Sequence, residues 1–445
     1  MPDRFDLVVL GAGPAGEKGA AQAAYFDRQV AIVERQPAPG GAAVHTGTLP
    51  SKTLRETALF LSGYRQRDLY GVAVHVSDDL AVSKLIERKD AVRELETARI
   101  RHNLDRHGIE QIRGTARFVD THTVDVSREG VPRRLSAEVF LIATGSRPFR
   151  PPGIPYEDPD VVDSDTILRI DRVPASLTVL GGGIIGCEYA SMFAALGVRV
   201  HLIEGRSGLL PFLDPEMGEH LRQAMTALGV DFRFGTRATK VRREAGSGLV
   251  CTLTTGDRVA SEKVLVASGR VGDTETLDPA SVGVATDERG HVLVDDDYRT
   301  TVAGIYAAGD VIGFPALAST SMEQARVALC HAFGFPYKRE VSSLLPYGVY
   351  TIPEVSCVGL GEEEARRRGL DVVVGRAYFR ENARGQIVGD VEGMVKLVLT
   401  APRERWSGAI ASASEPRSWY TWDRRPSCWK GPSRRSSRWC STIRR

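Results

Sequence analysis

Closely spaced cysteines and long apolar runs are both missing from this sequence. Its 445 residues include six cysteines, and none shows the pairing of a disulfide framework or the spacing of a zinc site. No apolar run approaches the roughly 18 residues that a membrane helix needs. The run Leu7-Val8-Val9-Leu10 is short, lacks a basic leader and ends at glycine, so it predicts a strand and not a signal peptide. We therefore expect a cytoplasmic protein without a metal site or a membrane partner.

The body of the chain also lacks an excess of positive charge. The net charge of +2 is unevenly distributed, since residues 401–445 carry 11 basic and three acidic side chains. The first 400 residues are therefore mildly acidic, which gives no reason to expect nucleic-acid binding. With 42% hydrophobic and 26% charged residues, a chain of this length predicts two or three globular domains.

A strand, a glycine-rich turn, a helix and a second strand open the chain. The apolar run at 5–10 leads into Gly11-Ala12-Gly13-Pro14-Ala15-Gly16 and an alanine-rich segment, and Val30-Ala31-Ile32-Val33 then ends at Glu34. This order predicts a dinucleotide site. Gly11 would make the tight turn, Gly13 would let the backbone approach a pyrophosphate, and Gly16 would let helix and strand pack closely. Glu34 can accept hydrogen bonds from ribose hydroxyls.

The same construction returns in the middle of the chain. The run 176–180 leads into a second glycine turn, with Gly181, Gly183 and Gly186 in the spaced positions, and the next strand ends at Glu204. Two such units predict two bound dinucleotides. A short strand with a small-residue turn follows each copy, at 140–147 and at 264–270, which indicates a duplicated fold.

Two side chains of the second unit bear on the choice of nucleotide. Glu204 is placed to accept from the adenosine ribose 2′-hydroxyl of NAD(H), and Arg206 could hold the 2′-phosphate of NADP(H). A site that carries both could serve both nucleotides. The alternative is that Arg206 is only a surface charge.

The loop at 40–52 resembles the redox-active loop of the pyridine nucleotide-disulfide oxidoreductases. That pattern reads Gly-Gly-x-Cys, four residues, Cys, x-Pro-Ser-Lys, and here Ala43 and Thr48 stand at the cysteine positions. A methyl and a hydroxyl group cannot form a thiolate or a disulfide. We therefore predict a flavoenzyme that works between soluble electron carriers, without a protein dithiol.

Four phrases narrow the resemblance to the soluble, FAD-dependent transhydrogenases of this family. They are His45-Thr46-Gly47-Thr48 with Pro50-Ser51-Lys52, Gly186-Cys187-Glu188-Tyr189-Ala190-Ser191, Phe212-Leu213-Asp214 and Gly309-Asp310-Val311-Ile312-Gly313. Thr48 matches that group, whereas Ala43 departs from it. His45 is expected to make a structural hydrogen bond within the loop.

The resemblance implies an α/β fold class, with two Rossmann-like dinucleotide-binding domains and a truncated α+β dimerisation domain. The FAD domain would comprise 1–150 and 272–340, the NAD(P) domain 151–271, and the partial interface domain 341–400. The family forms homodimers or larger homo-oligomers, which the altered C-terminus puts in doubt for this chain.

The resemblance also implies the site residues and the reaction. Hydride would pass from NADPH to the flavin N5 and then to NAD⁺ in a ping-pong sequence, with Lys52 by the flavin edge and Glu188 paired with it as catalytic residues. Asp310 would bind the flavin ribityl chain. The full set of expected cofactor-binding residues for FAD, NADP(H) and NAD(H) is Gly11, Gly13, Gly16, Glu34, Gly41, Thr48, Lys52, Ala116, Thr144, Gly145, Gly181, Gly183, Gly186, Glu204, Arg206, Gly269 and Asp310.

The last 45 residues do not fit the rest of the chain. All five tryptophans and ten arginines lie beyond position 400, and no helix or strand period is visible there. Disordered tails are poor in tryptophan and cysteine. We therefore hypothesise a frameshift near position 400, which would make 401–445 a non-native tail.

Three other readings of the sequence are open. A dihydrolipoamide dehydrogenase or glutathione reductase would need the two missing cysteines. An NAD(P)H oxidase or diaphorase would differ only in the electron acceptor. An inactive product of a frameshifted gene would bind FAD at most.

Overall fold

The computed structural model describes residues 2–63, 78–400 and 405–413, and it divides into two compact units. The first unit comprises 1–53, 87–149 and 269–343, and the second comprises 54–86, 150–268 and 344–445. Helices α3 (Thr48–Leu61) and α4 (Asp78–Arg106) contribute residues to both units. The proposed division into FAD, NAD(P) and interface domains stays a prediction.

A seven-stranded sheet forms the centre of the first unit. Its strands run in the order β3-β2-β1-β6-β5-β4, and β17 pairs with β6. The pairs β1–β2, β1–β6, β2–β3 and β6–β17 are parallel, and β4–β5 and β5–β6 are antiparallel. The strands are β1 (Asp3–Leu10), β2 (Val30–Glu34), β3 (Glu110–Arg113), β4 (Thr115–Asp120), β5 (Thr123–Arg128), β6 (Val131–Ile142) and β17 (Ile305–Ala307).

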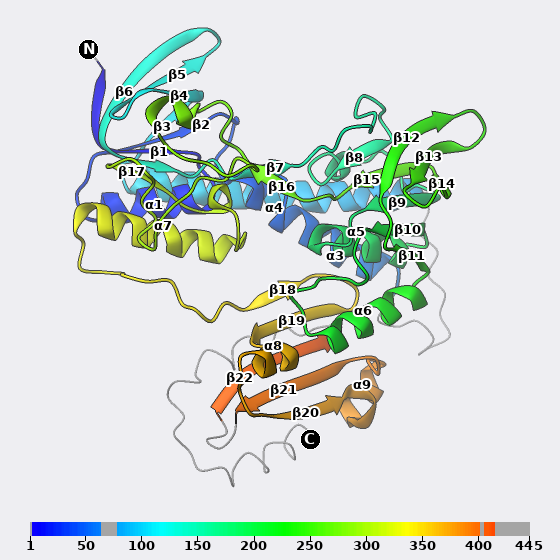
Figure 1. Ribbon diagram of the computed structural model, residues 1–445. Coiled ribbons are helices and arrows are strands. Elements are labelled where there is room, and N and C mark those ends of the chain that lie inside the picture. The colour runs from blue at the N-terminus through cyan, green and yellow to red at the C-terminus, as the bar shows by residue number, and fades with distance from the viewer. Residues whose placement is uncertain (1, 64–77, 401–404, 414–445) are drawn as a thin grey trace. The chain divides into compact units, whose positions relative to one another are not determined.

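Two helices pack together on this sheet because small residues line their contact. Figure 1 shows α1 (Pro14–Tyr25) and α7 (Ala318–Phe333) side by side. A Cβ on Gly19 of α1 would lie 2.7 Å from Leu141 Cδ2 and 3.2 Å from Leu329 Cδ1, so a larger residue there would force these leucine side chains to shift. The unit also contains α2 (Gly41–His45), β7 (Ser146–Pro148), β16 (Arg270–Gly272), η3 (Pro279–Val282) and η4 (Asp310–Ile312).

The second unit repeats this architecture, as the duplicated motifs predict. Its five-stranded parallel sheet has the order β11-β10-β9-β15-β8, beside the antiparallel sheet β12-β13-β14. The parallel part of each sheet has five strands, and the two copies differ in the chain position of the strand at one edge. In the first copy this strand, β17, comes after the other four in the chain, whereas in the second copy it is β8, which comes before them. The elements are β8 (Val161–Asp163), η2 (Ile167–Arg169), β9 (Ser176–Leu180), α5 (Ile184–Ala195), β10 (Arg199–Glu204), α6 (Pro215–Ala227), β11 (Val230–Phe234), β12 (Ala238–Glu244), β13 (Gly248–Leu253), β14 (Arg258–Ser261) and β15 (Lys263–Val266).

A five-stranded antiparallel sheet completes the second unit, in the order β18-β19-β22-β21-β20. The elements are β18 (Tyr347–Val349), β19 (Glu354–Gly359), α8 (Glu362–Arg367), β20 (Val372–Tyr378), η5 (Phe379–Glu381), α9 (Ala383–Val388), β21 (Met394–Thr400) and β22 (Arg405–Ala413). Strand β22 places 405–413 in the sheet, although we expected no strand beyond 400. The frameshift hypothesis stays a prediction, and 401–404 and 414–445 lie outside the described residues.

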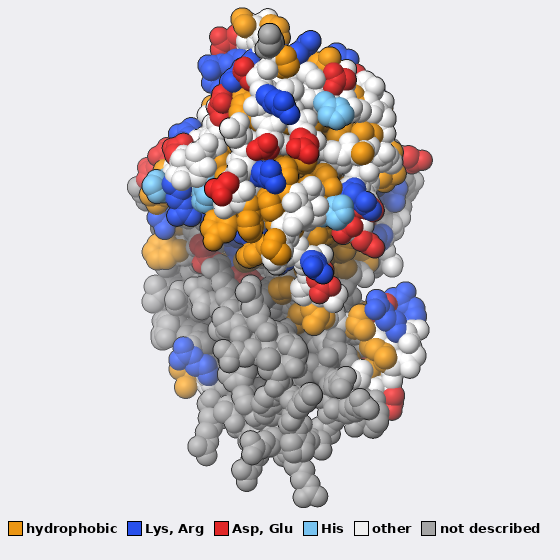
Figure 2. Space-filling view, turned by 90° about the vertical axis from the view of Figure 1, so that its left-hand side faces the viewer, with side chains coloured by type: hydrophobic (Ala, Val, Ile, Leu, Met, Phe, Trp, Pro, Cys, Tyr) orange, Lys and Arg blue, Asp and Glu red, His pale blue; other side chains and the backbone are white. Residues whose placement is uncertain are grey.

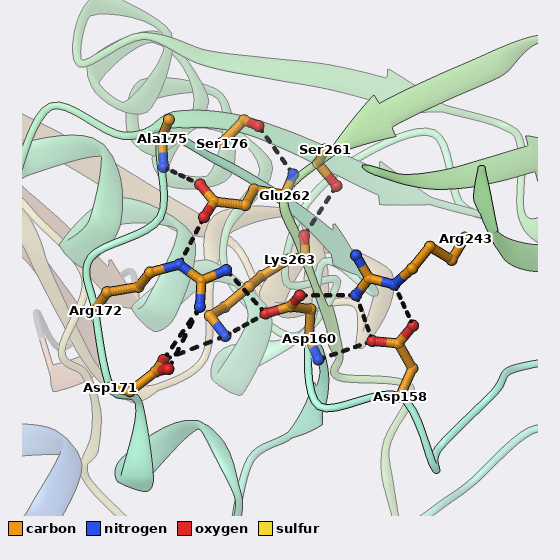
Figure 3. A network of polar contacts seen from close by, with 10 residues as sticks. All are labelled: Asp158, Asp160, Asp171, Arg172, Ala175, Ser176, Arg243, Ser261, Glu262 and Lys263. Carbon is orange, nitrogen blue, oxygen red and sulfur yellow. Dashed lines mark hydrogen bonds and ion pairs between the residues drawn. The ribbon is translucent and has the colours of Figure 1, made fainter. Parts of the chain in front are cut away.

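A cluster of charges around one buried lysine fixes one edge of the parallel sheet in the second unit (Figure 3). Lys263, almost fully buried at the start of β15, donates to Asp160 at 2.6 Å. Arg172 and Arg243 also bond to Asp160, at 3.1 and 2.7 Å. Burial would raise the pKa of Asp160, but the bonds from Lys263 and Arg243 lower it to about 2. The cluster joins the segment before β8 to β15 and β12.

The surface mixes charges of both signs. On the face that Figure 2 draws, acidic and basic side chains are interspersed and hydrophobic side chains gather between them. Among the described residues, no helix has the length and apolar character to cross a membrane.

A buried lysine links α6, α8 and β21 inside the second unit. Lys396, 3% exposed, lies 2.8 Å from Asp214 Oδ1 and 2.9 Å from both Glu216 Oε2 and Glu362 Oε2. Arg376 donates to Glu216 from 2.7 Å. Asp214 also accepts backbone N–H bonds from Glu216 and Glu362, so one carboxylate caps the starts of both α6 and α8.

This cluster predicts a loss of stability in acid. The hydrogen bond from Arg376, with the charge of Lys396, lowers the pKa of Glu216 from 4.5 to about 2 against the effect of burial. A lowered pKa in the folded state contributes stability that is complete above pH 4.5 and is lost as the pH falls toward 2. Glu216→Gln should lower the thermal unfolding midpoint at pH 7, and the difference from wild type should shrink by pH 3 in scanning calorimetry.

Glu219→Gln is the matched control. Its carboxylate pairs with Arg222 within α6, which lowers its pKa to a similar value, but its side chain is 50% exposed. Solvent screening makes such pairs weak, so its midpoint should hardly change at either pH. Equal shifts of the midpoint in the two variants would show that the cluster around Lys396 adds no more stability than an exposed ion pair.

Candidate functional site

The first glycine turn has the geometry that close packing of a strand and a helix requires. Gly11 has a φ of +106°, and a Cβ there would collide with the Ala143 carbonyl. A Cβ on Gly16 would collide with the Gly11 carbonyl. Around Gly13, in contrast, the nearest atom to a Cβ would be Gly41 Cα at 3.8 Å. Gly13 is also the N-cap of α1, so open backbone and a helix N-terminus meet where a pyrophosphate would bind.

Glu34 stands at the end of β2 and is held by backbone amides. Its Oε2 accepts from Ala12 N–H at 2.9 Å, and its Oε1 accepts from Gln36 N–H at 2.8 Å. An open cleft surrounds it, lined by Ala12, Ile32, Glu34, Gln36, Pro37, Ala38, Pro39, Arg101, Gln111, Ile112 and Arg113. Arg101 and Arg113 were not predicted as site residues, because neither belongs to a local motif. Ala116 lies on β4 with its side chain in the core and is not among the lining residues.

The loop at 40–52 packs directly on the glycine turn. Gly40 N–H donates to Ala12 O at 2.8 Å, and a Cβ on Gly41 would lie 2.8 Å from Gly13 Cα. His45 Nε2 lies 2.9 Å from Pro39 O, which is the expected structural hydrogen bond within the loop.

The two residues at the cysteine positions lie in the two helices of the loop segment. Ala43 lies within α2, and Thr48 is the first residue of α3. Lys52 follows on α3, with its Nζ 3.5 Å from Ser51 Oγ. Because Lys52 belongs to the first unit and Glu188 to the second, their pairing stays a prediction.

Asp310 is oriented by a chain of hydrogen bonds from two other segments of the first unit. Ser146 Oγ donates to Asp310 Oδ2 at 3.2 Å, and Arg270 Nε donates to Ser146 Oγ at 2.8 Å. Arginine only donates, so the single hydroxyl proton of Ser146 is directed to the aspartate. Ser146 and Arg270 were not predicted as site residues, although both directly follow the repeated small-residue turns that contain Gly145 and Gly269.

One buried group beside these turns lacks a partner. Thr144 Oγ1 is buried and has no hydrogen-bond partner among the described residues. Gly145 and Gly269 both have positive φ, of +74° and +108°, with no atom within 4 Å of a Cβ. An unsatisfied hydroxyl, open glycines and a carboxylate with one committed oxygen fit a polar ligand such as a dinucleotide.

The second glycine turn repeats the first. Gly181 has a φ of +116°, a Cβ on Gly186 would collide with the Gly181 carbonyl, and no atom lies within 4 Å of a Cβ on Gly183. Glu204 Oε2 accepts from Gly182 N–H at 2.6 Å, as Glu34 accepts from Ala12. The expected site residues of this unit therefore lie together at the end of the parallel sheet.

Glu204 and Arg206 form an ion pair. Arg206 Nε lies 2.9 Å from Glu204 Oε1, Nη2 lies 3.0 Å from Oε2, and the Arg206 backbone N–H adds a bond of 2.9 Å. Burial would raise the pKa of Glu204, but these bonds and the Gly182 amide lower it below its ordinary value. Glu204 therefore remains a carboxylate, and Arg206 is committed to it.

Glu188 is buried on α5 and is held from the segment before β19. Its Oε1 accepts from Tyr350 N–H at 2.9 Å. One turn along the helix, Ser191 Oγ accepts from Ile352 N–H at 3.0 Å. Arg55 Nε donates to Thr351 O at 3.0 Å, so the segment is fixed from α3 and α5 together. The hydrogen bond between Glu188 and the segment before β19 was not predicted from the sequence.

Comparison with known proteins defines the class. Residues 5–331 match the profile described as pyridine nucleotide-disulphide oxidoreductase, and residues 345–416 match the dimerisation domain of the same family. The chain belongs to the pyridine nucleotide-disulphide oxidoreductase family. This confirms the expected fold class and the use of FAD and nicotinamide dinucleotides.

Individual relatives are more specific. The chain is 45% identical over 399 residues to the soluble pyridine nucleotide transhydrogenase of Mycobacterium tuberculosis (strain ATCC 25177 / H37Ra), covering 89% of this chain and 85% of that protein. It is 37% identical to the protein of the same name from Colwellia psychrerythraea, covering 89% and 84%. The solved HOCl-induced flavoprotein disulfide reductase RclA from Escherichia coli superposes with a TM-score of 0.84 at 28% identity, covering 94% and 92%. These findings confirm the resemblance seen in the sequence.

Thr144→Val tests whether the hydroxyl of Thr144 forms a hydrogen bond with FAD. Because the buried oxygen has no hydrogen-bond partner within the described part of the chain, its removal should leave the thermal midpoint of the FAD-free protein unchanged or raise it. The same change should weaken FAD binding roughly five- to tenfold, the worth of about one hydrogen bond. FAD titration by fluorescence quenching and calorimetry of the FAD-free protein measure the two effects.

Thr178→Val provides the contrast. Thr178 Oγ1 is fully buried and donates to Ser261 Oγ at 2.8 Å. Its loss should lower the midpoint of the FAD-free protein and leave FAD affinity unchanged. A Thr144→Val variant that instead loses stability and binds FAD normally would contradict the assignment.

Proposed function

We propose that this chain transfers hydride between NADPH and NAD⁺ through bound FAD, in a ping-pong sequence without a protein dithiol. The observation that carries the proposal is the loop at 40–52, where Ala43 and Thr48 replace both sulfurs of the family pattern. Without them the loop offers no dithiol acceptor, so the electrons would leave on a soluble acceptor, which we propose is a second nicotinamide.

Three of the four described cysteines support this interpretation. Burial raises the pKa of Cys187 far above its ordinary value, and it raises the pKa of Cys357 to about 11. Burial also raises the pKa of Cys251 to about 12. Thiols that stay protonated do not attack disulfides. The naming of the relatives as transhydrogenases agrees with the proposal.

When bound, FAD supplies the chemistry, because its isoalloxazine can take a hydride from one nicotinamide and give it to another. The protein's part is to bind, orient and stabilise. Gly11, Gly13, Gly16 and Glu34 would hold the adenosine diphosphate part, and Asp310 would accept from the ribityl hydroxyls through its Oδ1. Lys52 would supply a positive charge near the flavin.

Glu188 would act from the second unit. Its carboxylate is buried, and the Tyr350 amide fixes one oxygen. A buried carboxylate with a fixed orientation can pair with Lys52 and connect the nicotinamide and flavin sites. This pairing is part of the proposal.

The second glycine turn would bind both nicotinamide nucleotides in turn. Glu204 would accept from the 2′-hydroxyl of NAD(H), and Arg206 would favour the 2′-phosphate of NADP(H). In the structure Arg206 also neutralises Glu204, which reduces the repulsion that the carboxylate would exert on a phosphate.

The dimerisation domain supports a homo-oligomer. We propose a dimer formed through the sheet β18-β19-β22-β21-β20. The names of the relatives describe soluble enzymes. We propose that this chain is likewise cytoplasmic.

Transhydrogenation can be measured directly. The FAD-loaded protein, mixed anaerobically with NADPH and thionicotinamide-NAD⁺, should oxidise the first and reduce the second in equal amounts. Glutathione disulfide and lipoamide should not be reduced above background. Consumption of NADPH only when oxygen or a quinone is present would instead identify an oxidase or diaphorase, and reduction of a disulfide at enzymatic rates would refute the proposal.

Arg206→Ala should raise the KM for NADPH more than the KM for NADH, because it leaves Glu204 uncompensated beside the 2′-phosphate. The ratio of the KM for NADPH to the KM for NADH should rise roughly tenfold, which corresponds to the loss of one hydrogen bond to a charged group. Steady-state kinetics with each donor measure it. Arg233→Ala, which removes an arginine paired with Asp231 on β11, is the matched control and should change neither KM. Equal increases for both donors would exclude a dual site.

A further inference from the structure

A second arginine lies beside the Glu204–Arg206 pair and was not singled out by any motif. The side chain of Arg237 runs along the backbone of Gly205, the residue between the pair. A Cβ on Gly205 would lie 3.0 Å from Arg237 Cγ and 3.3 Å from its Cδ, and nearer still to Nε. Glycine at 205 therefore creates the space that the arginine fills.

Backbone hydrogen bonds hold this arrangement in place. Gly235 N–H donates to Arg206 O at 3.1 Å, and Thr236 N–H donates to Glu204 O at 3.4 Å. Arg237 itself exchanges bonds with Thr254, accepting from its N–H at 2.9 Å and donating to its Oγ1 at 3.2 Å. The segment that carries Arg237 is thus bonded to the residues on both sides of Gly205.

The two arginines differ in what they are free to bind. Arg206 is engaged by both oxygens of Glu204. Arg237 is exposed, and the ion pairs and hydrogen bonds of the described residues include none from its guanidinium. Five donors in a rigid fork are therefore available beside the end of β10.

Charge balance explains why a second arginine is needed. A phosphate monoester carries about −1.5 to −2 charges at pH 7. Glu204 and Arg206 together are neutral, so they cannot offset that charge without breaking their own pair. Arg237 adds a positive charge to the site without disturbing the carboxylate that NAD(H) would use.

The first unit offers an internal comparison. Glu34 accepts N–H bonds from Ala12 and Gln36, as Glu204 does from Gly182 and Arg206, so the two carboxylates occupy equivalent positions. The residue after Glu34 is Arg35, whose guanidinium is paired with Asp273. FAD has no 2′-phosphate, and the arginine that directly follows the acid in the unit expected to bind FAD is held by a carboxylate of that same unit.

We infer that Arg237 binds the adenosine 2′-phosphate of NADP(H) and is a specificity-determining residue of the second unit. The inference rests on the proposed function of that unit as the nicotinamide nucleotide site. It lets one site take both carriers, with Glu204 facing the hydroxyls of NAD(H) and Arg237 facing the phosphate of NADP(H). The Glu204–Arg206 pair stays intact in both cases.

Adenosine 2′,5′-bisphosphate and 5′-AMP are suitable probes, because they differ only in the 2′-phosphate and require no hydride transfer. Isothermal titration of the FAD-loaded full chain should show tighter binding of the bisphosphate. Arg237→Ala should reduce that preference roughly tenfold or more by weakening bisphosphate binding alone. Arg237→Lys should recover part of it, since it keeps the charge and loses the fork.

Two further variants guard the interpretation. Gly205→Ala keeps the charge but displaces the Arg237 side chain, so it should also reduce the preference. Arg242→Ala removes another exposed arginine, on β12, and should leave both affinities unchanged. The loss should also shrink at high ionic strength, where the wild-type preference itself is screened.

The outcomes separate the two levels of the argument. A wild-type preference for the bisphosphate that Arg237→Ala retains would overturn this inference and leave the proposed function standing. Failure of the wild-type chain to bind either probe would overturn both. Equal weakening of the two probes by Arg237→Ala would also overturn the inference, because it would indicate a general structural role.

Discussion

Both nucleotide sites depend on one close contact, the stacking of a helical glycine on the carbonyl of the glycine that opens the turn. Gly16 lies against Gly11, and Gly186 lies against Gly181, at distances that admit no Cβ. This contact brings the start of each helix next to the end of its strand. It therefore determines where the helix N-terminus, the open middle glycine and the acid at the end of the second strand meet, and every other feature of the two sites is arranged around that point.

The duplicated units diverge at the acid. Glu34 and Glu204 each accept from two backbone amides at equivalent positions of their units, yet the neighbouring side chains differ. Two residues after the acid, the first unit has the neutral Gln36 and the second has the charged Arg206. One residue after the acid, the first unit has Arg35, which pairs with Asp273, and the second has Gly205, which leaves room for Arg237. In the proposed function, one scaffold thus supplies a site suited to a dinucleotide with free ribose hydroxyls and another suited to either a hydroxyl or a phosphate. This difference between the two sites arises from a few side chains. The backbone contacts that hold the carboxylate are the same in kind in both units.

The sheet β18-β19-β22-β21-β20 also supports the nucleotide-binding part of its unit. Its leading segment donates to Glu188 through the Tyr350 amide, and the buried Lys396 ties β21 to Asp214 at the start of α6. The orientation of a proposed catalytic carboxylate and the capping of two helices therefore both depend on residues beyond position 340. A change in this part of the chain would therefore affect the proposed hydride-transfer site even if the two nucleotide-binding folds formed normally.

The sequence alone determined the two glycine turns, their acids, the duplicated architecture and the absence of a dithiol, because each of these is a local pattern of residue type and spacing. It also indicated the family, which the comparisons confirm. The tertiary structure decided the partners. Ser146 meets Asp310 across 164 positions, Tyr350 meets Glu188 across 162, and Lys396 meets Asp214 across 182. No period or motif encodes such pairs, since they arise only when distant segments pack together. Arg237 shows this most clearly, because nothing near it in the chain distinguishes it from other exposed arginines until Gly205 is seen beneath it.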